Sequence, residues 1–150
     1  MYKLLFALLL LFVSSVYSQD DKDLKKTVNI TGDSIDYRID NIWALVKFNG
    51  SEINKELFKK TKPYIEIKIL QNRLGGNTGC NEFFVSSEFT GGKILIGNDI
   101  TLTKMSCDDM GFESDFIQAV KGKTYDYKTD GLNLYFSDGD KVILEFRKID

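Results

Sequence analysis

The chain has 150 residues, with 20 Lys and Arg, 22 Asp and Glu, two Cys, one Pro and no His. This length suits one compact domain with a short tail. The absence of histidine excludes Ser-His-Asp and Cys-His catalysis, His-based zinc sites and a histidine pH switch. The formal net charge of −2 gives no general electrostatic reason to bind nucleic acid or anionic lipid.

The first eighteen residues have the pattern of a secretory signal peptide. Lys3 precedes an apolar run over residues 4–13, which is too short to cross about 30 Å of hydrocarbon as a helix. Cleavage after Ser18 is expected, with Ser15 as the alternative; an uncleaved anchor or a buried strand is the competing interpretation. We predict export to the periplasm or beyond the cell. No Cys lies near the cleavage site, so no lipid anchor is predicted.

The remaining chain divides into two parts. Residues 19–40 are expected to form a charged leader or short arm, because QDDKDLKK opens this stretch and only a partial apolar alternation follows. Residues 41–150 are expected to form one domain, without a repeat, a second domain or a transmembrane helix after signal removal.

The pattern from residue 42 onward is mostly that of β-strands, with apolar and polar residues alternating between turn signals. A loop or one helical turn is expected over 52–62. Gly75-Gly76-Asn77 is expected to form a tight reversal, because glycine permits positive φ. Leu132, Leu134 and Phe136 are expected to share one face, as are Val142, Leu144 and Phe146. The expected strands are 42–48, 64–69, 83–89, 93–96, 100–105 and three within 125–146.

One helix interrupts the strands. Phe112, Phe116 and Val120 recur at helical spacing and form an apolar stripe. Asp108 and Asp109 precede this stripe and are suited to cap the positive end of the helix. The residues alone therefore predict an α+β arrangement of about eight or nine short strands with a single helix.

The two cysteines predict a structural disulfide. Cys80 and Cys107 are the only cysteines of a chain expected to be exported, and an even number of cysteines in an oxidising compartment favours a bridge. Such a bridge would stabilise the fold by about 3–4 kcal/mol in the loop-entropy model. Two alternatives remain. The pair could be redox-active, or Met105, Cys107 and Met110 could bind Cu(I) through sulfur.

The spacing of several motifs resembles the META domain of bacterial envelope proteins, which include heat-inducible outer-membrane lipoproteins. The resemblance covers about residues 41–147 and rests on these motifs in combination. The matching residues are Trp43, Gly79, Cys80, Asn81, Thr103, Met105, Cys107, Glu113 and Phe116.

The resemblance implies a curved antiparallel β-sheet, or half-open β-barrel, of about eight strands with one helix packed on it. It implies no enzymatic activity, no cofactor and no metal, and a loose association with stress resistance and envelope maintenance. Many relatives carry a lipid on an N-terminal cysteine, and this chain lacks that cysteine. Membrane attachment therefore does not carry over.

Each polar or aromatic motif residue has a structural and a functional interpretation. Asn81 and Thr103 could form a recognition pair, but they are more typical of side chains that satisfy backbone groups at a bend. Glu113 could act as a general acid or base, but its place in the first helical turn favours a dipole or capping role. Trp43 could stack on a ligand, but a strand tryptophan is more often a core anchor.

Three functions compete. The first is a non-catalytic envelope protein, monomeric, that binds a protein partner or a hydrophobic ligand in an apolar groove under the helix. The second is a secreted inhibitor or chaperone-like protein that presents the loop 75–78. The third is a carboxylate-based hydrolase, for which the sequence offers no constrained pair of acidic residues. We expect no catalytic residue and no nucleic-acid partner.

Overall fold

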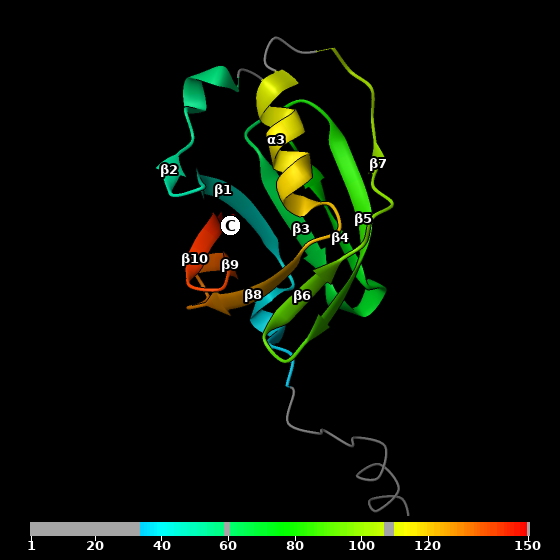
Figure 1. The fold of residues 1–150 in the computed structure, drawn as a ribbon, viewed down its shortest axis with the longest axis vertical. Helices are drawn as coiled ribbons and strands as arrows, with labels where there is room; N and C mark the ends of the chain where they lie inside the picture. Colours follow the sequence, from blue (N-terminus) through cyan, green and yellow to red (C-terminus); the bar gives the residue numbers. More distant parts are fainter. Residues whose placement is uncertain (1–33, 59–60, 107–109, 150) are drawn as a thin grey trace, which may run out of the picture. The chain divides into compact units, whose positions relative to one another are not determined.

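The structure is a computed structural model that describes residues 34–58, 61–106 and 110–149 (Figure 1). The predicted signal peptide, most of the leader, and Cys107 lie outside the described residues. The elements are η1 (Tyr37–Ile39), β1 (Ile42–Phe48), β2 (Ser51–Glu52), η2 (Lys55–Leu57), β3 (Tyr64–Lys68), η3 (Ile69–Gln71), β4 (Arg73–Asn77), β5 (Glu82–Thr90), β6 (Lys93–Ile96), β7 (Thr101–Leu102), α3 (Met110–Val120), β8 (Thr124–Thr129), β9 (Asn133–Asp138) and β10 (Lys141–Lys148).

Eight strands form an antiparallel barrel. They pair in the order β1-β3-β4-β5-β6-β8-β9-β10, and β10 pairs back with β1. The short strands β2 and β7 pair with β1 and β5 outside this ring. The predicted α+β class is confirmed, and the β1–β10 pairing closes the ring of strands that the resemblance left half-open.

The barrel interior is filled by the apolar residues of the alternating strands. In β5, every second residue is buried, so Phe83, Val85 and Phe89 point inward. Trp43 on β1 is fully buried, and its indole nitrogen donates to the carbonyl of Ile39 at 2.9 Å. Ile39 is itself fully buried, so η1 belongs to the folded core although it precedes the boundary expected at residue 41.

The helix α3 packs on the barrel through its aromatic residues. The ring of Phe112 lies 6.0 Å from that of Phe48 on β1, and the ring of Phe116 lies 5.9 Å from that of Phe83 on β5. Figure 1 shows α3 between these two sides of the barrel. The predicted helix is confirmed. The capping role expected for residues 108 and 109 lies outside the described residues.

The reversal expected at Gly75-Gly76-Asn77 is wrong, because these residues belong to strand β4 and are buried. Both glycines instead permit close approach of neighbouring groups. A Cβ atom on Gly76 would lie 2.1 Å from the carbonyl oxygen of Tyr64 on β3. The chain reverses before β4, where Asn72 adopts the left-handed conformation with φ 47°. Residues 75–78 therefore do not form an exposed loop.

Two expected face assignments near the C-terminus are also wrong. Leu132 is 69% exposed because it lies in the turn before β9, whereas Leu134 is fully buried. Val142 is 38% exposed because the register of β10 against β9 shifts between Val142 and Leu144. A bulge of this kind changes the face to which the preceding side chains point.

We predict that Gly76→Ala destabilises the protein by about 3 kcal/mol or more, because the methyl group would overlap the backbone of β3. Gly139→Ala is the control. Gly139 has φ 57° and nothing within 4 Å of an added Cβ, so its cost should be about 1 kcal/mol, from conformation alone. Urea unfolding of both variants measures the difference. Equal losses would contradict a steric role for Gly76.

Candidate functional site

Most of the motif residues converge on a tight turn between β4 and β5. The amide of Thr78 donates to the carbonyl of Asn81 at 2.9 Å, which closes the turn. The Asn77 side chain accepts from the amide of Gly79 at 2.7 Å. Gly79 has φ 98°, a conformation that glycine adopts without strain. The sequence forms a turn here because Asn and Thr side chains bond to backbone amides further along the chain.

The side-chain amide of Asn81 binds the segment before Cys107. Its oxygen accepts from the amide of Met105 at 2.6 Å, and its nitrogen donates to the carbonyl of Met105 at 3.2 Å. The same oxygen accepts from the hydroxyl of Thr103 at 2.9 Å. Asn81 is only 1% exposed. Its amide thus pairs with residue 105 as a neighbouring strand would.

Glu113 connects this turn to α3. One carboxylate oxygen accepts from the hydroxyl of Thr78 at 2.6 Å, and both oxygens accept from the amide nitrogen of Asn81 at 3.0 and 3.1 Å. Glu113 is 5% exposed. The carboxylate is therefore enclosed by donors from the turn, and it serves to hold the first turn of the helix against the barrel.

The aromatic ring of Phe58 covers Gly79 from outside the turn. A Cβ atom on Gly79 would lie 2.3 Å from this ring, so any other residue would displace it. The ring of Phe58 also lies 4.9 Å from that of Phe112 on α3. Gly79 therefore has two roles, because it permits both the positive φ and the packing of the segment after η2.

The structure brings together six of the nine motif residues. Trp43 lies apart from them, Phe116 packs in the core, and Cys107 is outside the described residues. Cys80 is 7% exposed, and its sulfur lies 3.6 Å from the carbonyl oxygen of Met105. Thr103 accepts from the amide of Glu82 at 3.0 Å and so joins β7 to β5. Trp43 packs in the core and interacts with η1 instead. The cluster is formed by Gly79, Cys80, Asn81, Thr103, Met105 and Glu113.

Sequence reasoning missed two members of this cluster. The hydroxyl of Thr78 accepts from the amides of Cys80 and Asn81 at 3.3 and 3.0 Å while it donates to Glu113. A Thr directly before a Gly is a signal for such a turn. Phe58 lies in a polar stretch, and no local pattern in the sequence marks its long-range contact.

The sulfur cluster proposed as a Cu(I) alternative is described only in part. Met105 is 52% exposed, Cys107 lies outside the described residues, and nothing is described for the side chain of Met110. Within the described ranges, no three His, Cys, Asp or Glu residues lie close enough together to hold a metal ion. Those same ranges contain no helix with the length and apolar character needed to span a membrane.

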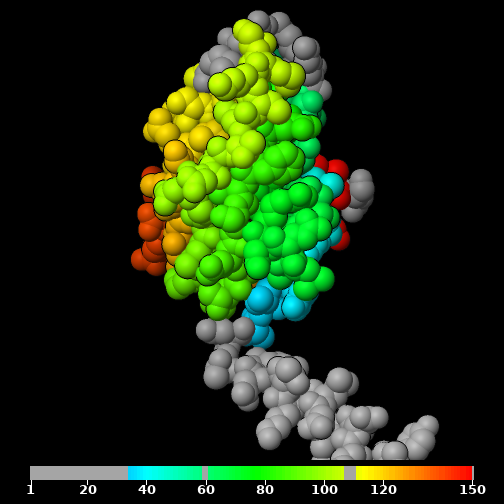
Figure 2. Space-filling view, turned by 90° about the vertical axis from the view of Figure 1, so that its right-hand side faces the viewer, coloured from blue at the N-terminus to red at the C-terminus, as the bar shows by residue number. Residues whose placement is uncertain are grey.

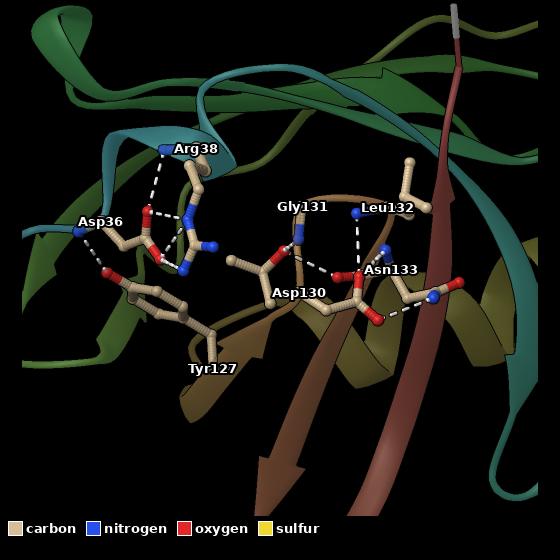
Figure 3. A network of polar contacts seen from close by, with 8 residues as sticks. Asp36, Arg38, Tyr127, Asp130, Gly131, Leu132 and Asn133 are labelled. Atoms are coloured by element: carbon tan, nitrogen blue, oxygen red, sulfur yellow. Dashed lines mark hydrogen bonds and ion pairs between the residues drawn. The ribbon is translucent and has the colours of Figure 1, made fainter.

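A second group of polar contacts joins η1 to β8, and the β8–β9 turn beside it has hydrogen bonds of its own (Figure 3). Arg38 donates to both carboxylate oxygens of Asp36, the shortest bond being 2.6 Å. These bonds lower the pKa of Asp36. The amide of Asp36 donates to the hydroxyl of Tyr127 on β8 at 3.3 Å. These contacts therefore attach the segment before β1 to strand β8.

Asp130 organises the neighbouring β8–β9 turn. Its carboxylate accepts from the amides of Leu132 and Asn133 at 2.8 and 2.7 Å and from the Asn133 side chain at 3.0 Å. The bonds from Asn133, followed by that from Leu132, lower the pKa of Asp130 to about 2. This turn is exposed, and its hydrogen bonds are local.

The family of the protein follows from its sequence and agrees with this fold. The model of the META domain matches residues 37–148, so the chain belongs to the META domain family. The matched range includes η1, in agreement with the burial of Ile39.

Two solved structures share the fold. An NMR structure of a protein from Burkholderia xenovorans is 17% identical, with a TM-score of 0.55 over 73% of this chain and 82% of that chain. A second NMR structure is 15% identical, with a TM-score of 0.55 over 73% of this chain and 89% of that chain. At these identities the likeness concerns the fold alone. No curated protein matches the chain.

We predict that Asn81→Asp destabilises the protein by about 3 kcal/mol or more. The change removes the donors to Met105 and Glu113 and places a second carboxylate about 3 Å from the first. Asn54→Asp is the matched control, because exposed Asn54 only accepts a bond from the amide of Glu56 and aspartate can do the same. Denaturant unfolding measures both, and similar stabilities would contradict the role of Asn81.

We predict that part of the stability is lost in acid through Asp130. Its pKa is about 2 in the folded protein against an ordinary value of 3.8, so its contribution is present above about pH 4 and disappears as the pH falls towards 2. The gap in the free energy of unfolding between wild type and Asp130→Ala should therefore shrink over that interval. A gap that stays constant from pH 6 to pH 2 would argue against this linkage.

Proposed function

We propose that the protein is an exported, non-catalytic META domain protein that acts in the cell envelope by binding a protein partner. The observation that carries this proposal is that the polar side chains of the family motif are buried and already hydrogen-bonded within the fold. Asn81 and Glu113 are buried, and their polar atoms bond to one another and to the turn. These motif residues therefore stabilise the fold, and we expect exposed residues elsewhere on the surface to contact the partner.

A hydrolase is the second candidate, and the geometry gives it little support. A carboxylate catalyst must reach its substrate, and a glycosidase needs two acidic groups facing each other across a cleft. Glu113 is 5% exposed and accepts bonds from Thr78 and Asn81. Other carboxylates also have structural partners: Asp130 lies in a turn, Asp126 forms a surface ion pair, and Asp40 accepts from the amide of Ile69.

A hydrophobic ligand under the helix is also less well supported than a protein partner. The rings of Phe112 and Phe116 lie between α3 and the barrel, and they contact Phe48, Phe58 and Phe83. An apolar ligand would have to displace these contacts. The inhibitor hypothesis required an exposed loop at residues 75–78, but these residues are buried.

Photo-crosslinking in intact cells tests the binding function. A photoreactive residue is placed at exposed Leu57, Leu70 or Leu132 in separate variants, with buried Leu134 as the control. A protein partner predicts one discrete adduct from at least one exposed position and none from the control. Absence of adducts at every exposed position would contradict the proposal, as would a hydrolase activity of the purified protein that Glu113→Gln abolishes.

We also propose that the exported protein carries a disulfide between Cys80 and Cys107. Support comes from the position of Cys80, whose sulfur lies beside the carbonyl of Met105, two residues before Cys107. The bridge would tie the β4–β5 turn to the approach to α3, in addition to the bonds of Asn81. Export itself is supported by the signal-like pattern of residues 1–18.

We predict that protein recovered from the envelope begins after Ser18 or Ser15 and resists alkylation at both cysteines until it is reduced. Replacing both cysteines with serine should lower the free energy of unfolding by about 2–4 kcal/mol. Intact-mass measurement before and after iodoacetamide, with reduced protein as the control, gives the result. Alkylation of both sulfurs in the native exported protein would contradict the bridge.

A further inference from the structure

An aromatic ring is held at the surface of the barrel, outside the motif. Phe84 lies on the outer face of β5, opposite Gly75 on β4. Its ring lies directly over that glycine, where an added Cβ would come within 2.8 Å of the ring. Phe84 is nevertheless 41% exposed, whereas Phe83 and Val85 beside it are buried. In Figure 2, the atoms of the residues coloured green, which include β5, fill the middle of the view.

Charged side chains flank one side of the ring. The guanidinium carbon of Arg73 lies 5.3 Å from the centre of the Phe84 ring. Glu66 pairs with Gly75 from the next strand, and its carboxylate lies 3.1 Å from the nitrogen of Lys68 and 3.8 Å from that of Arg73. The guanidinium of Arg73 thus lies over part of the ring and is paired with Glu66, while Phe84 as a whole remains 41% exposed.

Polar groups also lie on the other side. Tyr64 on β3 and Glu82 on β5 both pair with Asn77 of β4, so they occupy the next outward row of the sheet. Burial raises the pKa of Tyr64, and the charges of Glu82 and Glu66 raise it further. Its hydroxyl therefore stays protonated at neutral pH and can donate a hydrogen bond.

The chemistry of this surface fits a sugar. A pyranose ring has an apolar face that packs on an exposed aromatic ring, and its hydroxyls need both donors and acceptors at the rim. The two acidic and two basic side chains around Phe84 balance in charge, which gives no preference for an anionic or a cationic ligand. We propose that the outer face of β3, β4 and β5 binds a neutral saccharide chain, with one sugar ring stacked on Phe84 and its hydroxyls bonded to Glu66 and Arg73.

Gly75 is a positioning residue in this proposal. An alanine there keeps an allowed backbone conformation but forces the ring of Phe84 away from β4. The aromatic surface would then no longer lie beside the Glu66–Arg73 pair. This saccharide surface goes beyond the proposed function, and each can hold when the other fails.

NMR titration of the purified protein with cellohexaose and with chitohexaose tests the proposal. Binding to an open surface is expected at millimolar concentration, with shifts confined to amides of β3, β4 and β5. Phe84→Leu keeps an apolar side chain over Gly75 but removes the ring, and it should weaken binding by about tenfold. Gly75→Ala should weaken it as well, and Phe84→Trp should retain it. Leu132→Ser, on a distant exposed turn, is the control.

Three outcomes would overturn the proposal. The first is the absence of shifts with either oligosaccharide. The second is equal affinity of wild type and Phe84→Leu, which would remove the ring from the site. The third is a protein partner that crosslinks to position 84 in cells, combined with no chemical-shift change when the sugars are added to the purified protein. That result would make this surface a protein contact. Thermal unfolding of each variant shows whether it is folded at the temperature of the titration.

Discussion

The structure depends on the side-chain amide of one buried asparagine. Asn81 accepts from and donates to the backbone of Met105, accepts from Thr103 and donates to Glu113. No other side chain offers a donor and an acceptor in this planar arrangement, except the longer glutamine. Because Asn81 and Glu113 are buried, their polar groups would lose hydration without gaining hydrogen bonds if these partners were removed. The turn, the segment after β7 and the helix therefore form one cooperative unit.

Close packing around glycine is the second constraint. Gly76 lets β3 and β4 approach each other, and Gly79 receives the ring of Phe58. Phe58 in turn contacts Phe112, which stacks with Phe116 at 6.1 Å. An aromatic layer from the segment after η2 and from α3 thus packs beside the polar cluster and touches it at Gly79. A low local dielectric strengthens the hydrogen bonds that this layer covers.

The buried motif residues and the exposed side chains of the barrel occupy different parts of the fold. Shared residues such as Asn81 and Glu113 are buried and hold the helix on the barrel, whereas exposed aromatic and charged groups such as Phe84 and Arg73 lie on the outer face of the strands. In a fold stabilised in this way, exposed residues can be substituted without breaking the internal hydrogen bonds. Family membership consequently identifies the scaffold, and the surface has to be examined for what it binds.

The sequence by itself determined the fold class, the helix and most strands, because apolar spacing is local information. It also identified Gly79, Asn81 and Glu113 as a group, through spacing that resembles the META domain. Only the tertiary structure decided that Gly75 and Gly76 lie in a strand, since the groups they accommodate, Phe84 and Tyr64, come from neighbouring strands. The same holds for the bond from Thr78 to Glu113 and the packing of Phe58 on Gly79. These contacts join residues far apart in the chain, and no local pattern encodes which of them meet.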